Sequence, residues 1–183
     1  MCTISELPAR NIRSIVKIVT LAVALVAGCV RLPRAEPEIH LIPQGYAGWV
    51  TIAFRGANGE VRAYEGDARM YRIPSSGILI TQAEPNVGSS PPWRFFFEDP
   101  EQTRTPIVHF WPTTVQDTEA NRIDPTIGIS YMHRGSLQGG QLRCDVEYDQ
   151  YFVGTKAQLL SAVGREPALH ETLRQFLAAN YRC

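Results

Sequence analysis

The side chains of this chain that could bind metal or transfer protons are spread along the sequence rather than gathered in motifs. The four histidines, His40, His109, His133 and His170, form neither an HxH nor an HExxH pattern. His109 and His133 lie on separate predicted strands and could meet in the folded chain, as a small hydrolase or metal-dependent enzyme would require. The plainer interpretation places His109 and His133 on sheet faces and His170 on a solvent-facing helix, so we assign no metal ligand.

The carboxylates and serines give no stronger indication of catalysis than the histidines do. Asp145, Glu147 and Asp149 are spaced two residues apart and could act as an acid–base pair. A solvated strand face explains the same spacing. Ser136 lacks the G-x-S-x-G elbow of a serine hydrolase, and the diglycine at 139–140 lacks the Lys-Ser/Thr of a phosphate-binding loop. We therefore predict no catalytic residue and no cofactor, and we favour a binding or structural protein over an enzyme.

The N-terminus has the charge and hydropathy pattern of an export signal. Residues 10–17 carry three positive charges, and residues 18–27 are a largely apolar run. Ten residues of helix are roughly 15 Å long, about half the thickness of a bilayer core, so this run is too short to span a membrane. Residues 1–28 are therefore predicted to be a signal peptide.

The five residues LVAGC at 25–29 resemble the lipobox of bacterial lipoproteins. The resemblance implies a diacylglyceryl group on the Cys29 thiol, cleavage after Gly28 and an acyl group on the new N-terminus. Such chains anchor a protein firmly, since each buried CH₂ contributes about 0.8 kcal/mol. Val30 is not the aspartate that commonly retains lipoproteins in the inner membrane, so the resemblance favours the periplasmic face of the outer membrane. An ordinary signal peptide with a chance cysteine, or a buried apolar helix, is the alternative.

Beyond the signal, the composition indicates a short tether and one domain. Residues 29–39 contain prolines and charges without periodicity and are predicted to be the tether, and residues 40–183 form a single domain. The whole chain has a formal net charge of zero, while residues 29–183 carry 15 basic and 17 acidic side chains. This balance gives no electrostatic reason to expect nucleic acid as a partner.

Two cysteines, Cys144 and Cys183, remain once the signal and Cys29 are set aside. An exported domain meets an oxidising compartment, so this even remainder predicts a disulfide. Closing a loop of about 40 residues would stabilise the fold by about 4 kcal/mol in the chain-entropy model. Two free thiols, one buried and one on the C-terminal tail, are the alternative.

Alternating apolar residues predict a mainly β domain. Residues 46–55 form a half-buried strand, with Val50, Ile52 and Phe54 on one face and Trp49, Thr51 and Ala53 on the other. Asn58-Gly59 predicts a type I′ hairpin turn, with residues 60–64 as the returning strand. Similar runs predict about seven to nine short strands in an antiparallel β-sandwich, with recognition on the long loops at 82–92 and 112–126.

The C-terminal segment, about 156–180, changes to a helical period. Thr155 and Gln158 fit a capping box that would start a helix over 156–163. Pro167 suits the first position of a second helix. Leu169, Leu173, Phe176 and Leu177 fall on one stripe of that helix, which predicts packing against the β core.

Three segments carry a family likeness. Residues 41–50, LIPQGYAGWV, resemble the opening of the bacterial domain of unknown function 6843, and residues 151–155, YFVGT, resemble an element before its terminal helix. The turn and strand at 73–81 also fit. The resemblance implies a small exported or lipid-anchored protein and brings no activity and no catalytic residues.

Tyr46 and Trp49, within the first of these segments, join large apolar area to a polar group. We interpret them as a strand entry at the edge of the core, or alternatively as an exposed aromatic surface for a ligand or partner. The sequence as a whole predicts a membrane-anchored exported lipoprotein of unspecified role that binds or supports the envelope. Its predicted partners are the membrane, through lipid on Cys29, and an unidentified envelope protein or small molecule.

Overall fold

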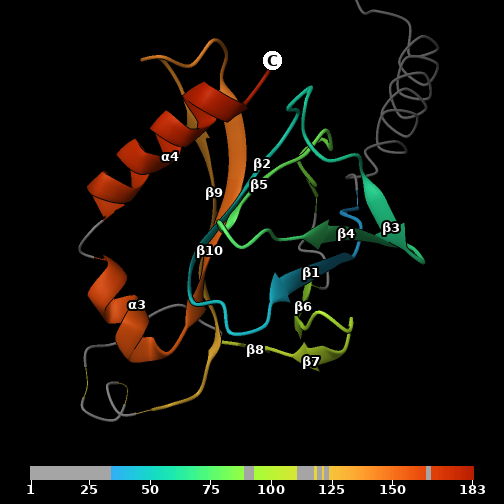
Figure 1. The fold of residues 1–183 in the computed structure, drawn as a ribbon, viewed down its shortest axis with the longest axis vertical. Coiled ribbons are helices and arrows are strands. Elements are labelled where there is room, and N and C mark those ends of the chain that lie inside the picture. Colours follow the sequence, from blue (N-terminus) through green and yellow to red (C-terminus); the bar gives the residue numbers. More distant parts are fainter. Residues whose placement is uncertain (1–33, 89–92, 111–117, 119–120, 122–123, 164–165) are drawn as a thin grey trace, which may run out of the picture. The chain divides into compact units, whose positions relative to one another are not determined.

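The computed structural model describes residues 34–88, 93–110, 118, 121, 124–163 and 166–183 (Figure 1). Residues Arg34–Cys183 form one compact unit. Cys29 and the signal peptide lie outside the described residues. Within the described ranges, no helix combines the length and the apolar character that a membrane span needs.

Sheet 1 has five strands in the order β3-β4-β1-β6-β7 (Figure 1). Its central strand is β1 (Glu38–Pro43), which pairs in parallel with β4 (Ala68–Arg72) and with β6 (Trp93–Glu98). The edge strands β3 (Ala63–Glu65) and β7 (Arg104–Pro106) pair antiparallel with their neighbours. The ordered domain thus begins before the predicted start at His40, because the last residues of the predicted tether, 29–39, belong to β1.

Sheet 2 also has five strands, in the order β5-β2-β10-β9-β8. Antiparallel pairs join β10 (Val146–Gly154) to β2 (Gly48–Ala53) and to β9 (Gly128–Leu137). The outer strands β5 (Ile78–Ile80) and β8 (Val108–His109) run parallel to β2 and β9. The mainly β prediction is confirmed, but the ten strands form two sheets of mixed rather than antiparallel orientation.

This mixed orientation follows from how the chain alternates between the sheets. After β1 the chain crosses to sheet 2 to form β2, then returns to sheet 1 for β3 and β4. Neighbours such as β1 and β4 are therefore joined by crossovers rather than by hairpins, and a crossover allows the parallel direction.

The main hydrophobic core lies where the two sheets meet. Val50, Ile52 and Phe54 from sheet 2 share one face, as the sequence predicted, and are at most 1% exposed. Phe95 and Phe97, which alternate along β6, contact the same core. Burial of such side chains is the main force that holds the sheets together. The buried members of the core are Ile42, Val50, Ile52, Phe54, Tyr71, Ile73, Leu79, Phe95, Phe97, Ile107, Ile129, Tyr151 and Val153.

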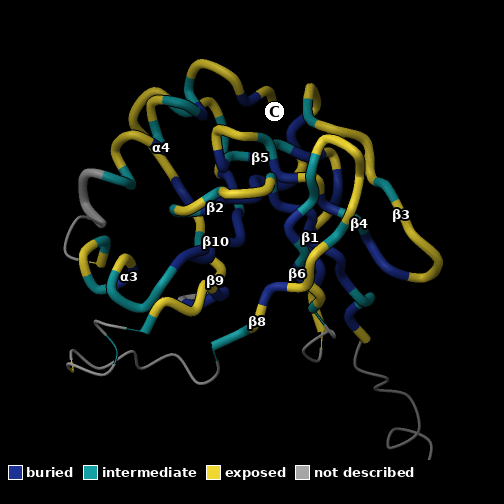
Figure 2. Tube along the Cα trace, turned by 60° about the horizontal axis from the view of Figure 1, so that its bottom comes forward, coloured by how far each residue is buried: buried dark blue, intermediate teal, exposed yellow. Residues whose placement is uncertain are grey.

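Two helices lie on the side of sheet 2 that is turned away from sheet 1 (Figure 1). The helix α3 (Lys156–Val163) has the predicted bounds, and α4 (Glu166–Asn180) begins one residue before the predicted Pro167. Leu173 and Leu177 of α4 pack in a second cluster with Ala53, Val146 and Tyr148 of sheet 2. Strand β10 is consequently buried almost throughout (Figure 2), and β2 is covered on both faces rather than half-buried.

The predicted hairpin at Asn58-Gly59 is wrong. Neither residue has the positive φ that a type I′ turn requires, and β2 pairs with β5 and β10 instead of with residues 60–64. The Asn58 side chain binds the C-terminal segment, donating to the Asn180 carbonyl at 2.7 Å and accepting from the Arg182 amide at 2.9 Å. A Cβ on Gly59 would lie 2.7 Å from the Ile80 backbone, so a glycine is needed where the chain passes this close to Ile80.

The remaining loop and cysteine predictions have mixed outcomes. Residues 82–88 contain neither helix nor strand, as predicted, while 89–92 and most of 112–126 lie outside the described residues. Cys144 and Cys183 lie at disulfide distance, with Cα atoms 6.2 Å apart. This link ties the C-terminus, beyond α4, to the segment that precedes β10. The Tyr181 hydroxyl donates to the Phe54 carbonyl at 2.5 Å and fixes the same tail to sheet 2.

Candidate functional site

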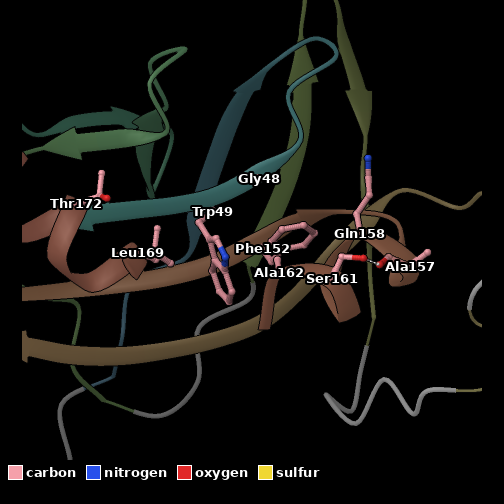
Figure 3. Close-up of a pocket in the computed structure, with 9 residues that line it drawn as sticks. All are labelled: Gly48, Trp49, Phe152, Ala157, Gln158, Ser161, Ala162, Leu169 and Thr172. Carbon is pink, nitrogen blue, oxygen red and sulfur yellow. Dashed lines mark hydrogen bonds between the residues drawn. The ribbon is translucent and has the colours of Figure 1, made fainter. Parts of the chain in front are cut away.

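A pocket of about 620 Å³ lies between sheet 2 and the two helices (Figure 3). Strands β2 and β10 supply one wall, and α3 and α4 supply the other. Its volume falls within the roughly 300–1,000 Å³ that is usual for small-molecule sites. The lining residues are Gly48, Trp49, Phe152, Ala157, Gln158, Ser161, Ala162, Leu169 and Thr172.

The strand wall of the pocket is aromatic. Trp49 and Phe152 are directly opposite in the pairing of β2 with β10, so their side chains share one face of sheet 2. Their ring centroids are 5.4 Å apart and the planes meet at 76°, which is the edge-to-face arrangement that aromatic pairs favour. Because both side chains lie on the face of sheet 2 that is turned toward the helices, the aromatic pair presents large apolar area to them.

The capping box predicted for α3 is present and positions the helix wall. The Thr155 amide donates to Gln158 Oε1 at 2.8 Å, and the Gln158 amide donates to Thr155 Oγ1 at 3.2 Å. One turn later, the Ser161 hydroxyl donates to the Ala157 carbonyl at 3.0 Å. The Gln158 oxygen and the Ser161 hydroxyl, which both border the pocket, thus already have hydrogen-bond partners within or next to α3.

The structure separates the two aromatic residues that the sequence singled out. Trp49 lines the pocket, whereas Tyr46 packs against the core between the sheets. The Tyr46 hydroxyl donates to the Trp49 carbonyl at 2.5 Å, and burial raises the pKa of Tyr46 to about 12. Tyr46 therefore fits the strand-entry interpretation, while Trp49 faces a space that could hold a ligand.

A buried polar relay, Glu38–His40–Tyr151, joins the sheets on the other side of sheet 2. The His40 ring lies 3.2 Å from Glu38 Oε2 through Nε2 and 3.1 Å from the Tyr151 hydroxyl through Nδ1. A ring protonated only at Nε2 satisfies both contacts, because Nε2–H donates to Glu38 and Nδ1 accepts from Tyr151. The sequence analysis missed this relay, although the i, i+2 spacing of Glu38 and His40 places them on one strand face.

The relay has the order carboxylate, imidazole, hydroxyl that hydrolases use, but all three side chains are buried. Glu38, His40 and Tyr151 are 2%, 1% and 0% exposed. Burial also raises the pKa of Tyr151 well above its usual value, which disfavours an ionised nucleophile. The relay is therefore a structural connection between β1 and β10.

Further polar residues surround Glu38. The Asn86 side chain donates to Glu38 Oε1 at 2.7 Å, and Arg134 binds both Asp149 carboxylate oxygens at 2.7 Å. Burial raises the pKa of Glu38, but hydrogen bonds from His40 and Asn86 and the positive charge nearby outweigh it and lower that pKa. A smaller pocket of about 280 Å³ lies against Glu38, Asn86, Arg134 and Asp149.

The three carboxylates proposed as an acid–base pair have separate partners. Asp149 binds Arg134 and is buried, contrary to the solvated-face interpretation. Glu147 accepts from Arg55 at 2.5 Å, and Asp145 accepts from the Gln138 amide at 3.1 Å. The described contacts therefore engage each carboxylate with a different cationic or amide group.

The histidines considered for metal binding lie on opposite faces of sheet 2. The His109 ring is 5.9 Å from Phe95 in the core between the sheets, while the His133 ring is 6.0 Å from Tyr148 on the helix side. Burial lowers the pKa of His109. Across the described residues, no group of three or more His, Cys, Asp or Glu side chains is placed to hold a metal ion.

Comparison with known proteins identifies a family and a protein of the same fold. No curated protein matches it. A crystal structure of a proposed lipoprotein from Bacillus anthracis has the same fold, with a TM-score of 0.56 and 17% identity, covering 79% of this chain and 95% of that one. Residues 34–161 match a family of unknown function, DUF6843, and the chain therefore belongs to that family.

Proposed function

We propose that this protein is an exported lipoprotein, anchored through acylated Cys29, whose domain binds a small molecule in the pocket beneath α3 and α4. The observation that carries the binding role is the pocket itself, with Trp49 and Phe152 turned toward the helices. The LVAGC segment at 25–29 supports the anchor, and Val30 favours the outer membrane. The fold shared with a proposed lipoprotein is consistent with the anchor.

Binding is better supported than catalysis by the chemistry of the pocket. A catalytic site needs groups that accept or donate protons within reach of the substrate. The described lining residues include no Asp, Glu, His, Lys, Cys or Tyr. The relay that does contain such groups is closed to solvent. A small periplasmic hydrolase using His109 or His133 is the alternative, and substituting both histidines would remove its activity.

The test uses residues 34–183, because these form a compact unit that contains both cores and the Cys144–Cys183 link. The probe is anilinonaphthalene sulfonate (ANS), whose fluorescence rises in apolar sites. Ala162→Trp should fill the pocket and weaken binding of the probe at least tenfold. Ala179→Trp places the same side chain on an exposed part of α4 away from the pocket and should bind the probe as the parent protein does.

Circular dichroism and thermal unfolding establish that each variant is folded. If Ala162→Trp does not fold, Ser161→Trp replaces it, since Ser161 is exposed and borders the same pocket. A folded pocket variant that binds the probe as tightly as the parent would refute the pocket as the binding site.

A further inference from the structure

We infer that the pocket takes a single alkyl chain of an amphiphilic molecule, whose polar end stays in solvent. This inference rests on the proposed binding function and names the class of ligand. It draws on three features of the lining: its charge, the distribution of its polar groups and the arrangement of its aromatic rings.

The described lining residues are uncharged, and the polar ones among them are exposed. None of the described residues around the pocket carries a charge. Gln158, Ser161 and Thr172 are exposed, whereas Trp49 is partly buried and Phe152 is 4% exposed. A ligand that enters therefore passes from polar surroundings to apolar ones, which matches a molecule with a polar end and an apolar body.

The interior offers few hydrogen bonds to a ligand. The Gln158 oxygen accepts from the Thr155 amide, and the Ser161 hydroxyl donates to the Ala157 carbonyl. The indole N–H of Trp49 is the one polar side-chain group among Trp49, Phe152 and Leu169, so most polar groups placed there would lose hydrogen bonds to water that these side chains do not replace. The part of the ligand that enters must therefore be hydrocarbon.

The aromatic pair favours a chain over a flat ring system. Trp49 and Phe152 meet at 76° and their edge-to-face contact uses one of the ring faces, so the pair offers no parallel ring faces between which a flat ring system could stack. The helix wall adds small side chains, Ala157 and Ala162, which leave room without imposing a shape. A flexible chain can follow such an uneven surface.

The proposed occupant is an alkyl chain of another molecule, and a protein that lacks Cys29 tests this directly. Strand β1 lies in the middle of sheet 1, whereas α3 and α4, which border the pocket, lie on the side of sheet 2 that is turned away from sheet 1 (Figure 1). Residues 34–183 lack Cys29, so binding to this unit tests capture from solution directly.

The experiment titrates residues 34–183 with straight-chain primary alcohols from hexanol to dodecanol by calorimetry, and with naphthalenemethanol as a planar comparison. Each added methylene should tighten Kd about fourfold until the pocket is full, after which Kd should level off. The alcohols should displace ANS. Ala162→Trp should abolish this binding and Ala179→Trp should leave it unchanged.

The outcomes separate the two proposals. If ANS binds at the pocket but no alcohol displaces it, the alkyl ligand is wrong and the binding function stands. Affinity that does not depend on chain length, or naphthalenemethanol binding as tightly as decanol, also overturns the alkyl ligand. If neither ANS nor any alcohol binds the folded protein, both proposals fail.

Discussion

The Glu38 carboxylate, buried between the sheets, links the stability of the domain to pH. It faces His40 and accepts a hydrogen bond from Asn86, and these contacts outweigh burial to lower its pKa below the ordinary 4.5. A group whose pKa is lower in the folded state stabilises that state above its unfolded pKa. The stabilisation is lost as the pH falls through the folded pKa.

Glu38→Gln should therefore make the free energy of unfolding depend less on pH in the acid range. We expect the free energy of unfolding of the parent to fall more steeply below pH 4.5 than that of the variant, by up to about 1.4 kcal/mol per pH unit. Urea unfolding between pH 5.5 and 2.5 measures both slopes. Glu60→Gln, at an exposed carboxylate, should keep the parental slope, and equal slopes for the parent and Glu38→Gln would contradict the assignment.

At the level of single residues, the candidate site was only partly predictable. Trp49 stood out because its side chain joins large apolar area to a polar group, within a segment that carries the family likeness. Ala157 and Ala162 carry no chemical signature, and their place in the lining depends on how α3 docks on sheet 2. Glu38 was assigned to the tether because prolines and charges surround it, and its burial comes from pairing with distant strands.

Secondary-structure elements were predictable where local interactions define them. The bounds of α3 follow from a capping box whose two residues are three positions apart. The alternation of side chains along β2 likewise predicts which of them share a face of the strand. Pairing could not be inferred in this way, because β1 lies between β4 and β6, which are some 30 and 55 positions further along the chain. The Asn58-Gly59 hairpin failed for the same reason, since Asn58 binds the distant C-terminal segment.

The link between Cys144 and Cys183 should stabilise the attachment of α4 to sheet 2. Replacing both cysteines with alanine should lower the free energy of unfolding by about 2–4 kcal/mol, since the loop between them is 39 residues long. Urea unfolding of the unreduced proteins measures the difference, and a reducing agent should lower the parent to the level of the variant. Alkylation of both thiols in unreduced parent protein would show that they are not bonded.

For the whole molecule, the proposed compartment depends on acylation of Cys29. Cys29→Ala should abolish incorporation of radiolabelled palmitate and shift the protein out of the sedimented membrane fraction, because an apolar run of ten residues is too short to hold it there. Cys2→Ala removes the other N-terminal cysteine and should retain both label and membrane association. A mature N-terminus upstream of Cys29 in the parent protein would contradict the proposed processing.

The central position of β1 has a mechanical consequence. Strand β1 follows residues 34–37, the first described residues of the domain, and it is hydrogen-bonded in parallel to β4 on one side and to β6 on the other. A force that pulls on the N-terminal end of β1 acts along this strand. The hydrogen bonds to β4 and to β6 are then loaded together in shear, instead of breaking one after another. If the domain is anchored through Cys29 as proposed, this arrangement should resist unfolding when the anchor is pulled.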